Sequence, residues 1–351
     1  MHQQINIGWL TRNADPLLEN QLPSLRLRLS AAKTSTNLNI KSGTNLNIDS
    51  SDIFVISKYS YISPGDDLIL GKVLDFSNQI KAQKKILLVD YTDHYLYDLE
   101  SHRNQNIDPV IFNQYDRTSK FYKELIAKSD GIIVSSPGLY KEVSSYTQKP
   151  VYFLADAIDP VPSNFKNPTS TEVSGLWYGM HSTFKLFLSS LPKLSSSLDT
   201  TTRIHCLVQD FTFKKLKAKQ IEIPKTKNIV LEAEVWSFER MLKRAEKAHF
   251  IVIPSNVTDF RKSLASSNRL LTAFSLRRPV WATPIDSYRE FDEHFYNLDR
   301  PSFNINSELT NHTIAQTDLA FKVSMNYSMS SMGEYWSKLF FNILMKTNPL
   351  D

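Results

Sequence analysis

A cation-rich polar loop that leads into a helix offers the clearest anion-binding chemistry in this sequence. The loop lies within residues 259–291, and its cations are Arg261, Lys262 and Arg269. A helix N-terminus presents unpaired backbone N–H groups and a partial positive charge, so a diphosphate placed over it would meet donors from the backbone and from nearby cations. A capped surface helix with solvated cations explains the same residues equally well.

This helix is predicted by its cap, its apolar spacing and its end. Ser266 or Ser267 suits the N-cap position, and the apolar residues at helical spacing behind it are Leu270, Leu271 and Phe274. Pro279 ends the helix. The next residues, 280–282 (VWA), then have the pattern of a buried strand.

Acid–base chemistry is concentrated in one loop of the first half of the chain. Asp90, Asp93 and His94 lie at or just after KILLVD (85–90), which has the pattern of a buried strand. Because ligands of an open α/β sheet lie outside the carboxyl ends of its strands, we predict these three as catalytic residues. A histidine next to an aspartate is more often structural than catalytic, so that alternative stays open.

Composition indicates a globular chain with room for two domains. The 351 residues are 41% hydrophobic and 22% charged, with a formal net charge of +5. This charge suits phosphorylated ligands and leaves room for peripheral contact with anionic lipids. Because we identified no dense Lys/Arg block with interleaved aromatics, we predict no nucleic-acid partner. The only cysteine, Cys206, lies in an apolar run and is predicted to be a buried strand residue.

Several classes of protein are disfavoured by motifs that the sequence lacks. There is no G-x-G-x-x-G, no Walker loop and no zinc-spaced Cys/His set, which disfavours dehydrogenases, P-loop NTPases and zinc enzymes. No Asp-x-Asp pair follows a strand of the second half, so we predict no metal and no cofactor. The chain has no apolar run of the roughly 18 to 20 residues needed to span a bilayer and no signal-peptide pattern, which predicts a cytoplasmic protein.

Strands and helices alternate in two halves that a proline-rich linker within residues 156–171 separates. This order predicts an α/β protein with two Rossmann-like domains facing a cleft. We place the first domain at 1–160, the second at 161–330 and a last helix at 331–351. Residues 35–42 (STNLNIKS) and 43–50 (GTNLNIDS) are nearly identical, and their alternating apolar residues predict a small hairpin or an edge strand without chemistry.

The sequence around the cation-rich loop resembles the donor-binding half of GT-B glycosyltransferases of the family 1 and 4 type. The shared features are an apolar strand, Pro254, a polar loop, S-x-N-R, a helix, P-V-x-A and S-Y-x-E-F. The commonest retaining members carry two Glu eight positions apart. Aligned on Pro279, these fall on Leu264 and Thr272, so the chain is similar to a divergent branch without the carboxylate pair.

The resemblance implies a nucleotide-sugar donor site in the second domain. The residues that it assigns to the donor are Gly179, His181, Trp236, Ser237, Arg261, Lys262, Ser266, Ser267, Asn268 and Arg269. It also implies that the last helix returns to the first domain, and that a segment after the first strand lines the cleft through Ser24, Arg26 and Arg28. If that segment is extended, both arginines lie on one side; if it is helical, residues 24 and 28 share a face.

Together these observations predict a metal-independent, hexosyltransferase-type glycosyltransferase. It would move a sugar from a nucleotide-diphosphate sugar to the hydroxyl of a glycan, lipid or small molecule. Two alternatives remain: a GT-B-like scaffold that has lost activity, as the missing Glu pair suggests, and a two-lobed solute-binding protein, which the missing signal peptide disfavours. The sugar, nucleotide, acceptor, stereochemical outcome and oligomeric state are left open.

Overall fold

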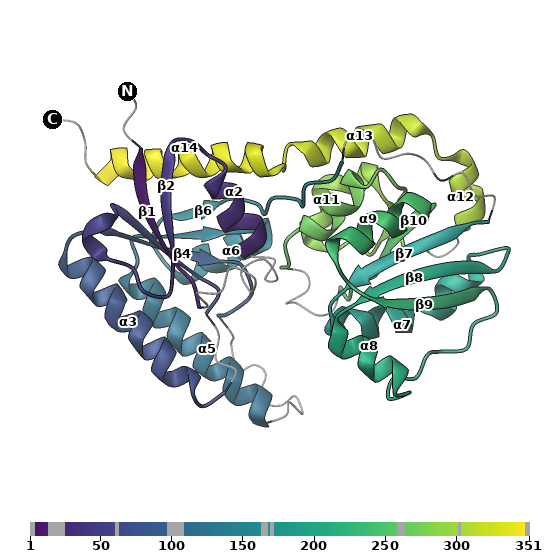
Figure 1. Ribbon diagram of the computed structural model, residues 1–351, viewed down its shortest axis with the longest axis horizontal. Coiled ribbons are helices and arrows are strands. Elements are labelled where there is room, and N and C mark those ends of the chain that lie inside the picture. Colours follow the sequence, from purple (N-terminus) through teal and green to yellow (C-terminus); the bar gives the residue numbers. More distant parts are fainter. Residues whose placement is uncertain are drawn as a thin grey trace. The chain divides into compact units, whose positions relative to one another are not determined.

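The computed structural model contains two six-stranded sheets in which neighbouring strands are parallel, with helices between successive strands (Figure 1). It describes residues 4–12, 25–59, 63–96, 109–162, 168, 172–257, 264–300 and 303–347. The predicted fold class, two Rossmann-like α/β domains, is confirmed.

The first sheet has the strand order β2-β1-β3-β4-β5-β6. Its strands are β1 (Ile5–Leu10), β2 (Leu38–Gly43), β3 (Ile53–Ser57), β4 (Ile86–Tyr91), β5 (Gly131–Val134) and β6 (Val151–Phe153). Between them lie a π-helical turn (Leu25–Leu29), α2 (Ser30–Lys33), a 3-10 turn (Ile48–Ser50), α3 (Asp66–Ala82), α5 (Pro109–Lys128) and α6 (Pro137–Tyr146). The central strands are apolar on both sides because helices cover both faces of the sheet.

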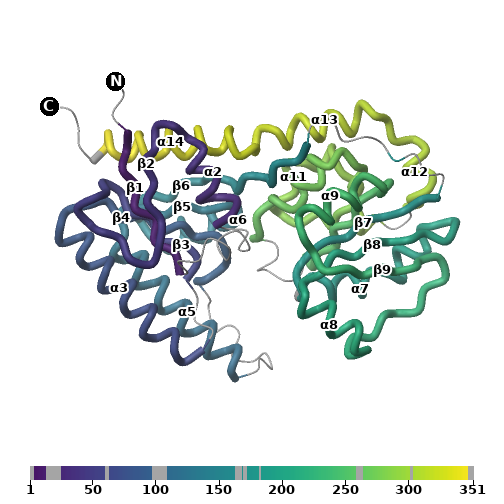
Figure 2. The backbone as a smooth tube through the Cα atoms, in the orientation of Figure 1, coloured from purple at the N-terminus to yellow at the C-terminus, as the bar shows by residue number. Residues whose placement is uncertain are grey.

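Each face of the first sheet has its own core. Residues of α3, α5 and α6 pack on one face, around Phe54, Val89 and Tyr91. On the other face, α2 and α14 (Met329–Thr347) pack around Trp9 and Trp336, whose ring centroids are 5.0 Å apart. The last helix of the chain is therefore part of the first core, and Figure 2 shows it in yellow beside α2.

The second sheet has the strand order β12-β11-β10-β7-β8-β9. Its strands are β7 (Ser174–Gly179), β8 (Thr202–Val208), β9 (Ile229–Val235), β10 (Phe250–Ile253), β11 (Val280–Ala282) and β12 (Tyr296–Asn297). Its helices are α7 (His181–Ser196), α8 (Asp210–Lys217), α9 (Phe238–Lys247), α11 (Asn268–Ser275), a 3-10 helix (Asp286–His294), α12 (Ile305–Asn311) and α13 (Ile314–Met325). One core joins α7 and α12 to the sheet around Trp177, Phe250 and Trp281.

The chain divides into two compact units. Unit 1 comprises Met1–Ala157, Leu264–Ser266 and Tyr327–Asp351, and unit 2 comprises Ile158–Ser263 and Ser267–Asn326. Short pieces from the second half of the sequence thus belong to the first unit. Among the described helices, none is both long and apolar enough to cross a membrane.

The structure confirms some of the predictions for single segments and corrects others. The first copy of the duplicated octapeptide forms β2, an edge strand as predicted, whereas the second copy ends in the 3-10 turn Ile48–Ser50. The segment with Arg26 and Arg28 is helical rather than extended. Cys206 lies buried in β8, which confirms its predicted position. Three predicted site residues, Ser24, Arg261 and Lys262, lie outside the described residues.

Candidate functional site

The predicted donor loop leads into α11 at the carboxyl edge of the second sheet. Ser267 is the N-cap of this helix, although its side chain makes no capping hydrogen bond. Arg269 is the second residue of α11, and its backbone carbonyl accepts a hydrogen bond from the Tyr178 hydroxyl (3.0 Å), which fastens the helix start to the end of β7. The predicted helix after the S-x-N-R sequence is confirmed.

The guanidinium of Arg269 lies among aromatic rings. Its central carbon is 5.3 Å from the ring centroid of Trp177 and 5.6 Å from that of Tyr178. Burial lowers the pKa of Arg269 from its usual value, while Tyr288 and Tyr178 act in the opposite direction. The rings stabilise the cation through their electron-rich faces.

Two nitrogen atoms of this guanidinium, Nε and Nη2, are buried and have no hydrogen-bond acceptor within the described chain. No carboxylate among the described residues forms an ion pair with Arg269, whereas buried charges in proteins are normally paired. A desolvated cation at the start of a helix that pairs with none of the described carboxylates can bind an anionic ligand.

The neighbouring polar residues of this loop are already engaged. Ser266 and Asn268 both take part in interactions within the structure. Their contact with the donor phosphates therefore remains a prediction.

A second turn at the same edge of the sheet contains Gly179 and His181. A Cβ atom on Gly179 would lie 2.6 Å from the Thr183 hydroxyl oxygen and 3.0 Å from the Trp177 ring, so a larger residue would displace the Thr183 side chain. The His181 backbone N–H donates to the Gln209 side chain (3.0 Å), and its Nδ1 lies 3.1 Å from the Thr212 hydroxyl. Burial lowers the pKa of His181, and Lys215 and Lys185 lower it further, so the ring is neutral at pH 7.

Trp236 and Ser237 connect β9 to α9, where the resemblance places base recognition. Ser237 is the N-cap of α9, and its hydroxyl accepts a hydrogen bond from the Arg240 backbone N–H (3.2 Å). The Trp236 backbone N–H donates to the Val208 carbonyl (2.7 Å). These contacts give both residues a structural role, and their predicted contact with the donor base remains a prediction.

In unit 1, the three residues that we predicted as a catalytic cluster have different partners and different exposure. Asp90 is fully buried, and its Oδ1 accepts from Arg28 Nε (2.8 Å) and lies 2.7 Å from Arg28 Nη2. Burial raises the pKa of Asp90, and Arg28 opposes that shift. Arg28 also donates to Asp156 (3.0 Å) and to the Leu154 carbonyl (2.6 Å). In this structure Asp90 is the buried counter-ion of Arg28.

Arg28 therefore does not lie where we expected it. We predicted a cleft-lining side chain, but Arg28 has no exposed surface, and its guanidinium lies 5.0 Å from the Trp336 ring centroid. Two carboxylates distant in sequence neutralise the charge and make its burial tolerable. Arg26, two residues earlier, is partly exposed and has a partner of its own.

The other two residues of the predicted cluster lie closer to the surface. Asp93 pairs with Lys58, and its side chain is 54% exposed. His94 is almost buried, and its Nδ1 lies 2.5 Å from Glu142 Oε1 on α6. The Tyr91 hydroxyl donates to the same Glu142 oxygen (3.4 Å) and accepts from the backbone N–H groups of Tyr95 and Leu96 at 2.8 Å.

Glu142 and Asp156 are residues of this region that we did not single out from the sequence. Glu142 lies 48 positions after His94 and directly follows Lys141 in α6, so no local pattern marks it. Asp156 lies in the segment that we assigned to the linker. Only the folded sheet, in which β5 lies beside β4 and β6 beside β5, brings these carboxylates to their partners.

The positions of the missing carboxylate pair are filled by uncharged, buried side chains. Leu264 is 6% exposed and belongs to the first core, and its carbonyl accepts from the Ser136 hydroxyl (2.7 Å). Thr272 is 5% exposed within α11. A search of the described residues finds no group of three or more His, Cys, Asp or Glu side chains that could hold a metal ion.

Comparisons with known proteins identify the fold but not the family. No family model matches the chain, and no curated protein matches it. Among solved structures, HepE from Anabaena in complex with UDP and glucose is 9% identical, with 97% of this chain and 100% of that chain covered at a TM-score of 0.59. An α-glucosyltransferase in complex with UDP is 12% identical, with 98% and 100% covered at a TM-score of 0.54. The chain has the GT-B fold that these proteins share.

One of these comparisons contradicts a prediction. The α-glucosyltransferase has also been solved with UDP and a 13-mer DNA, a structure that is 13% identical to this chain with a TM-score of 0.57. Our prediction that this protein has no nucleic-acid partner is therefore wrong. In the structure, α8 carries lysines beside aromatic residues, and Lys215 Nζ lies 4.4 Å from the Phe211 ring centroid.

Proposed function

We propose that this protein is a glycosyltransferase that moves a sugar from a nucleotide-diphosphate sugar to an acceptor hydroxyl. The observation that carries the proposal is Arg269, a desolvated guanidinium at the start of α11 that pairs with no carboxylate among the described residues. The GT-B fold supports it, because the HepE and α-glucosyltransferase structures that share this fold were solved with UDP.

The reaction explains why a cation is needed at this point. The bond between the anomeric carbon and the diphosphate oxygen breaks, a bond from that carbon to the acceptor oxygen forms, and the acceptor proton passes to a base. Negative charge grows on the departing diphosphate, and a positioned cation stabilises it. Arg269 supplies that charge, together with the backbone N–H groups at the start of α11.

The acceptor side of the reaction is assigned to unit 1. His94 is the candidate base, because its imidazole lies beside a carboxylate, with Nδ1 2.5 Å from Glu142 Oε1. Asp93 is a second, more exposed candidate. The transfer is proposed to be metal-independent, since protein cations replace the metal at the diphosphate. The acceptor class is open to glycans, lipids, small molecules and nucleic acid.

A second candidate function is donor binding without transfer. The observation that favours it is the replacement of the usual carboxylate pair by the buried Leu264 and Thr272. Such a protein would bind a nucleotide sugar but would neither hydrolyse nor transfer it.

The test compares Arg269→Met with the matched control Arg289→Met, whose arginine is 71% exposed and pairs with Asp286. Methionine retains most of the apolar stem and removes the charge. Because charge-assisted hydrogen bonds contribute on the order of 1.5–3 kcal/mol each, UDP affinity in calorimetric titration should fall roughly ten- to a hundredfold in Arg269→Met and stay unchanged in the control. Without nucleotide, Arg269→Met should melt at the same or a higher temperature, because the substitution removes a buried cation that pairs with none of the described carboxylates.

The opposite pattern, a lower melting temperature with unchanged UDP affinity, would show that Arg269 is structural and would remove the donor site from α11. UDP release from UDP-sugars then separates the two functions. Release that continues with a chelator present supports a metal-independent enzyme, whereas release restored only by manganese contradicts it. Binding without any release, across a panel of sugars and acceptors, supports the second candidate.

A further inference from the structure

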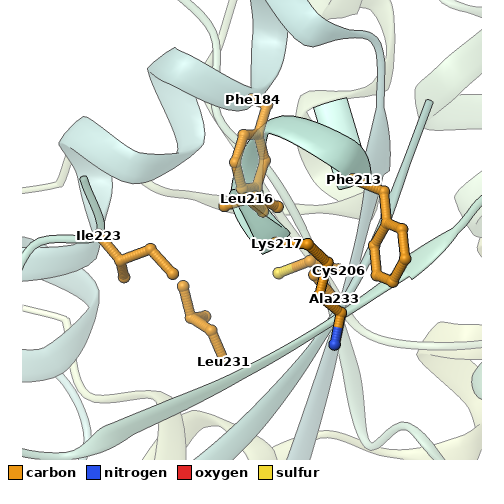
Figure 3. A pocket seen from close by; sticks show the side chains of 8 residues that line it. All are labelled: Phe184, Cys206, Phe213, Leu216, Lys217, Ile223, Leu231 and Ala233. Atoms are coloured by element: carbon orange, nitrogen blue, oxygen red, sulfur yellow. The ribbon is translucent and has the colours of Figure 1, made fainter. Parts of the chain in front are cut away.

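An apolar cavity of about 180 Å³ lies in unit 2 under α8. It is lined by Phe184, Cys206, Phe213, Leu216, Lys217, Ile223, Leu231 and Ala233 (Figure 3). The lining comes from α7, from the last two strands of the sheet, from α8 and from the segment that follows it. None of these residues is among those that we assign to the donor or to the acid–base chemistry.

Small side chains on two neighbouring strands create this space. Cys206 on β8 is the register partner of Ala233 on β9, so two small residues lie side by side on the floor. Because β9 is the edge strand and α8 has only eight residues, the sheet is thinly covered at this point. The cavity thus results from the short helix over the edge of the sheet and from the small side chains of Cys206 and Ala233.

The floor and walls are suited to an apolar group. Phe184 and Cys206 are almost fully buried, and the Cys206 thiol makes only a weak contact to the Ile204 carbonyl (3.8 Å). Burial raises the pKa of this thiol far above its usual value, so it acts here as a small hydrophobe. A cavity of about 150 Å³ with apolar walls holds benzene, so this one holds roughly six to eight non-hydrogen atoms.

The rim adds a positive charge. Lys217 and Ile223 are the exposed members of the lining. The Lys217 ammonium lies 5.4 Å from the Phe213 ring centroid, and no described carboxylate forms an ion pair with it. Lys214, by contrast, pairs with Asp210. The surroundings are basic as well, because the lysines of residues 210–227 (214, 215, 217, 219, 225 and 227) outnumber the acids, Asp210 and Glu222.

We propose that this cavity binds an aliphatic carboxylate of about six to eight carbons, with its chain against Cys206 and Ala233 and its carboxylate beside Lys217. The apolar lining selects the chain. The unpaired ammonium selects the anionic head. The site is separate from the donor chemistry and does not depend on the proposed glycosyl transfer.

Octanoate below its critical micelle concentration is the probe, and octanol is its neutral counterpart. The full-length protein should bind octanoate with one-to-one, saturable heat in calorimetric titration. Lys217→Gln should weaken octanoate binding by about two- to fivefold, the range for an exposed charge pair, and leave octanol binding unchanged. The matched control, Lys214→Gln, should leave both unchanged.

Two further variants locate the ligand. Ala233→Leu fills the floor and should abolish binding, whereas the control Ala218→Leu, on the exposed end of α8, should not. No octanoate binding by the wild-type protein, or equal binding in Ala233→Leu, would overturn the proposal. Equal octanoate binding in Lys217→Gln would overturn the assignment of the anionic head.

Discussion

Asp90 and Asp93 are three positions apart, yet they have opposite surroundings. Asp90 and Arg28 are both fully buried, and Asp156 and the Leu154 carbonyl complete the contacts of the guanidinium. Asp93 and Lys58 form a pair in which the carboxylate is half exposed. Removing one partner of a buried pair leaves an uncompensated charge, whereas an exposed pair contributes little.

Asp90→Asn should therefore lower the free energy of unfolding by roughly 3 kcal/mol, because Arg28 loses its closest counter-charge. Asp93→Asn, the matched control, should change it by less than about 1 kcal/mol. Urea denaturation of both variants checks this. Equal effects would mean that the buried network does not stabilise the domain, and would return Asp90 to the list of catalytic candidates.

Glu142→Gln should reduce turnover without weakening the binding of the donor nucleotide. The amide keeps the shape of the side chain but removes the negative charge beside His94 Nδ1, so the imidazole loses its neighbouring carboxylate. We expect UDP release to fall about ten- to a hundredfold while the dissociation constant of UDP stays the same. The control Glu124→Gln changes a half-exposed residue of α5 that pairs with Lys128. Unchanged turnover in Glu142→Gln would rule out a role for this pair.

At the scale of elements, the approach of α14 to α2 depends on a glycine. A Cβ atom on Gly333 would lie 2.6 Å from the Ala31 carbonyl oxygen and 2.2 Å from the Thr34 hydroxyl oxygen. The same two helices share the hydrogen bond from the Thr34 hydroxyl to the Met329 carbonyl (3.0 Å). Gly71, inside α3, has no atom within 4 Å of the corresponding position.

The two glycines should therefore respond to alanine in opposite ways. Gly333→Ala should destabilise unit 1 by about 1–3 kcal/mol, because the helices must move apart. Gly71→Ala should stabilise it by up to about 1 kcal/mol, because alanine is the better helix former and meets no neighbour. Chemical denaturation of the two variants beside the wild type measures both signs. A stabilising Gly333→Ala would show that α14 does not need this close contact.

For the whole molecule, two histidines of unit 2 make stability depend on pH. Burial lowers the pKa of His205, and Arg244 lowers it further. Burial also lowers the pKa of His312, whose ring nitrogens lie 2.8 Å from the Tyr296 hydroxyl and 2.7 Å from the Thr317 hydroxyl. Below the unfolded value of about 6.5, the unfolded chain binds protons that the folded chain does not.

The free energy of unfolding should therefore fall as the pH drops from about 6.5 toward the lower folded values, and should be insensitive to these residues above about pH 7.5. The double variant His205→Gln, His312→Gln should lose less stability than the wild type between about pH 7 and pH 5. Urea titrations at several pH values measure the difference, and the data at about pH 8 give the intrinsic effect of the substitutions. If the free energy of unfolding depended on pH in the same way in both proteins, these two histidines would not be the cause of the pH dependence.

The alternation of strands and helices could be predicted from the sequence because it depends on local periodicity. Apolar runs such as residues 86–89 and 250–253 mark strands that helices cover on both faces, and both are strands in the structure. The Ser-Ser-Asn sequence and the apolar spacing behind it predicted α11 for the same reason. These features depend on residues within a few positions of one another, so the two-domain α/β fold followed from them.

Only the tertiary structure decided which residues meet. STNLNIKS forms an edge strand beside β1, whereas the nearly identical GTNLNIDS ends in a 3-10 turn, because β1 offers one free edge and β3 already occupies the other. Arg28 has the sequence pattern of a solvated cation, yet it is buried because Asp90 and Asp156 converge on it. Folding also brings His94 next to Glu142, which lies 48 positions later in the chain. A charge partner is set by distance in space, and residues far apart in the chain carry no local mark of it.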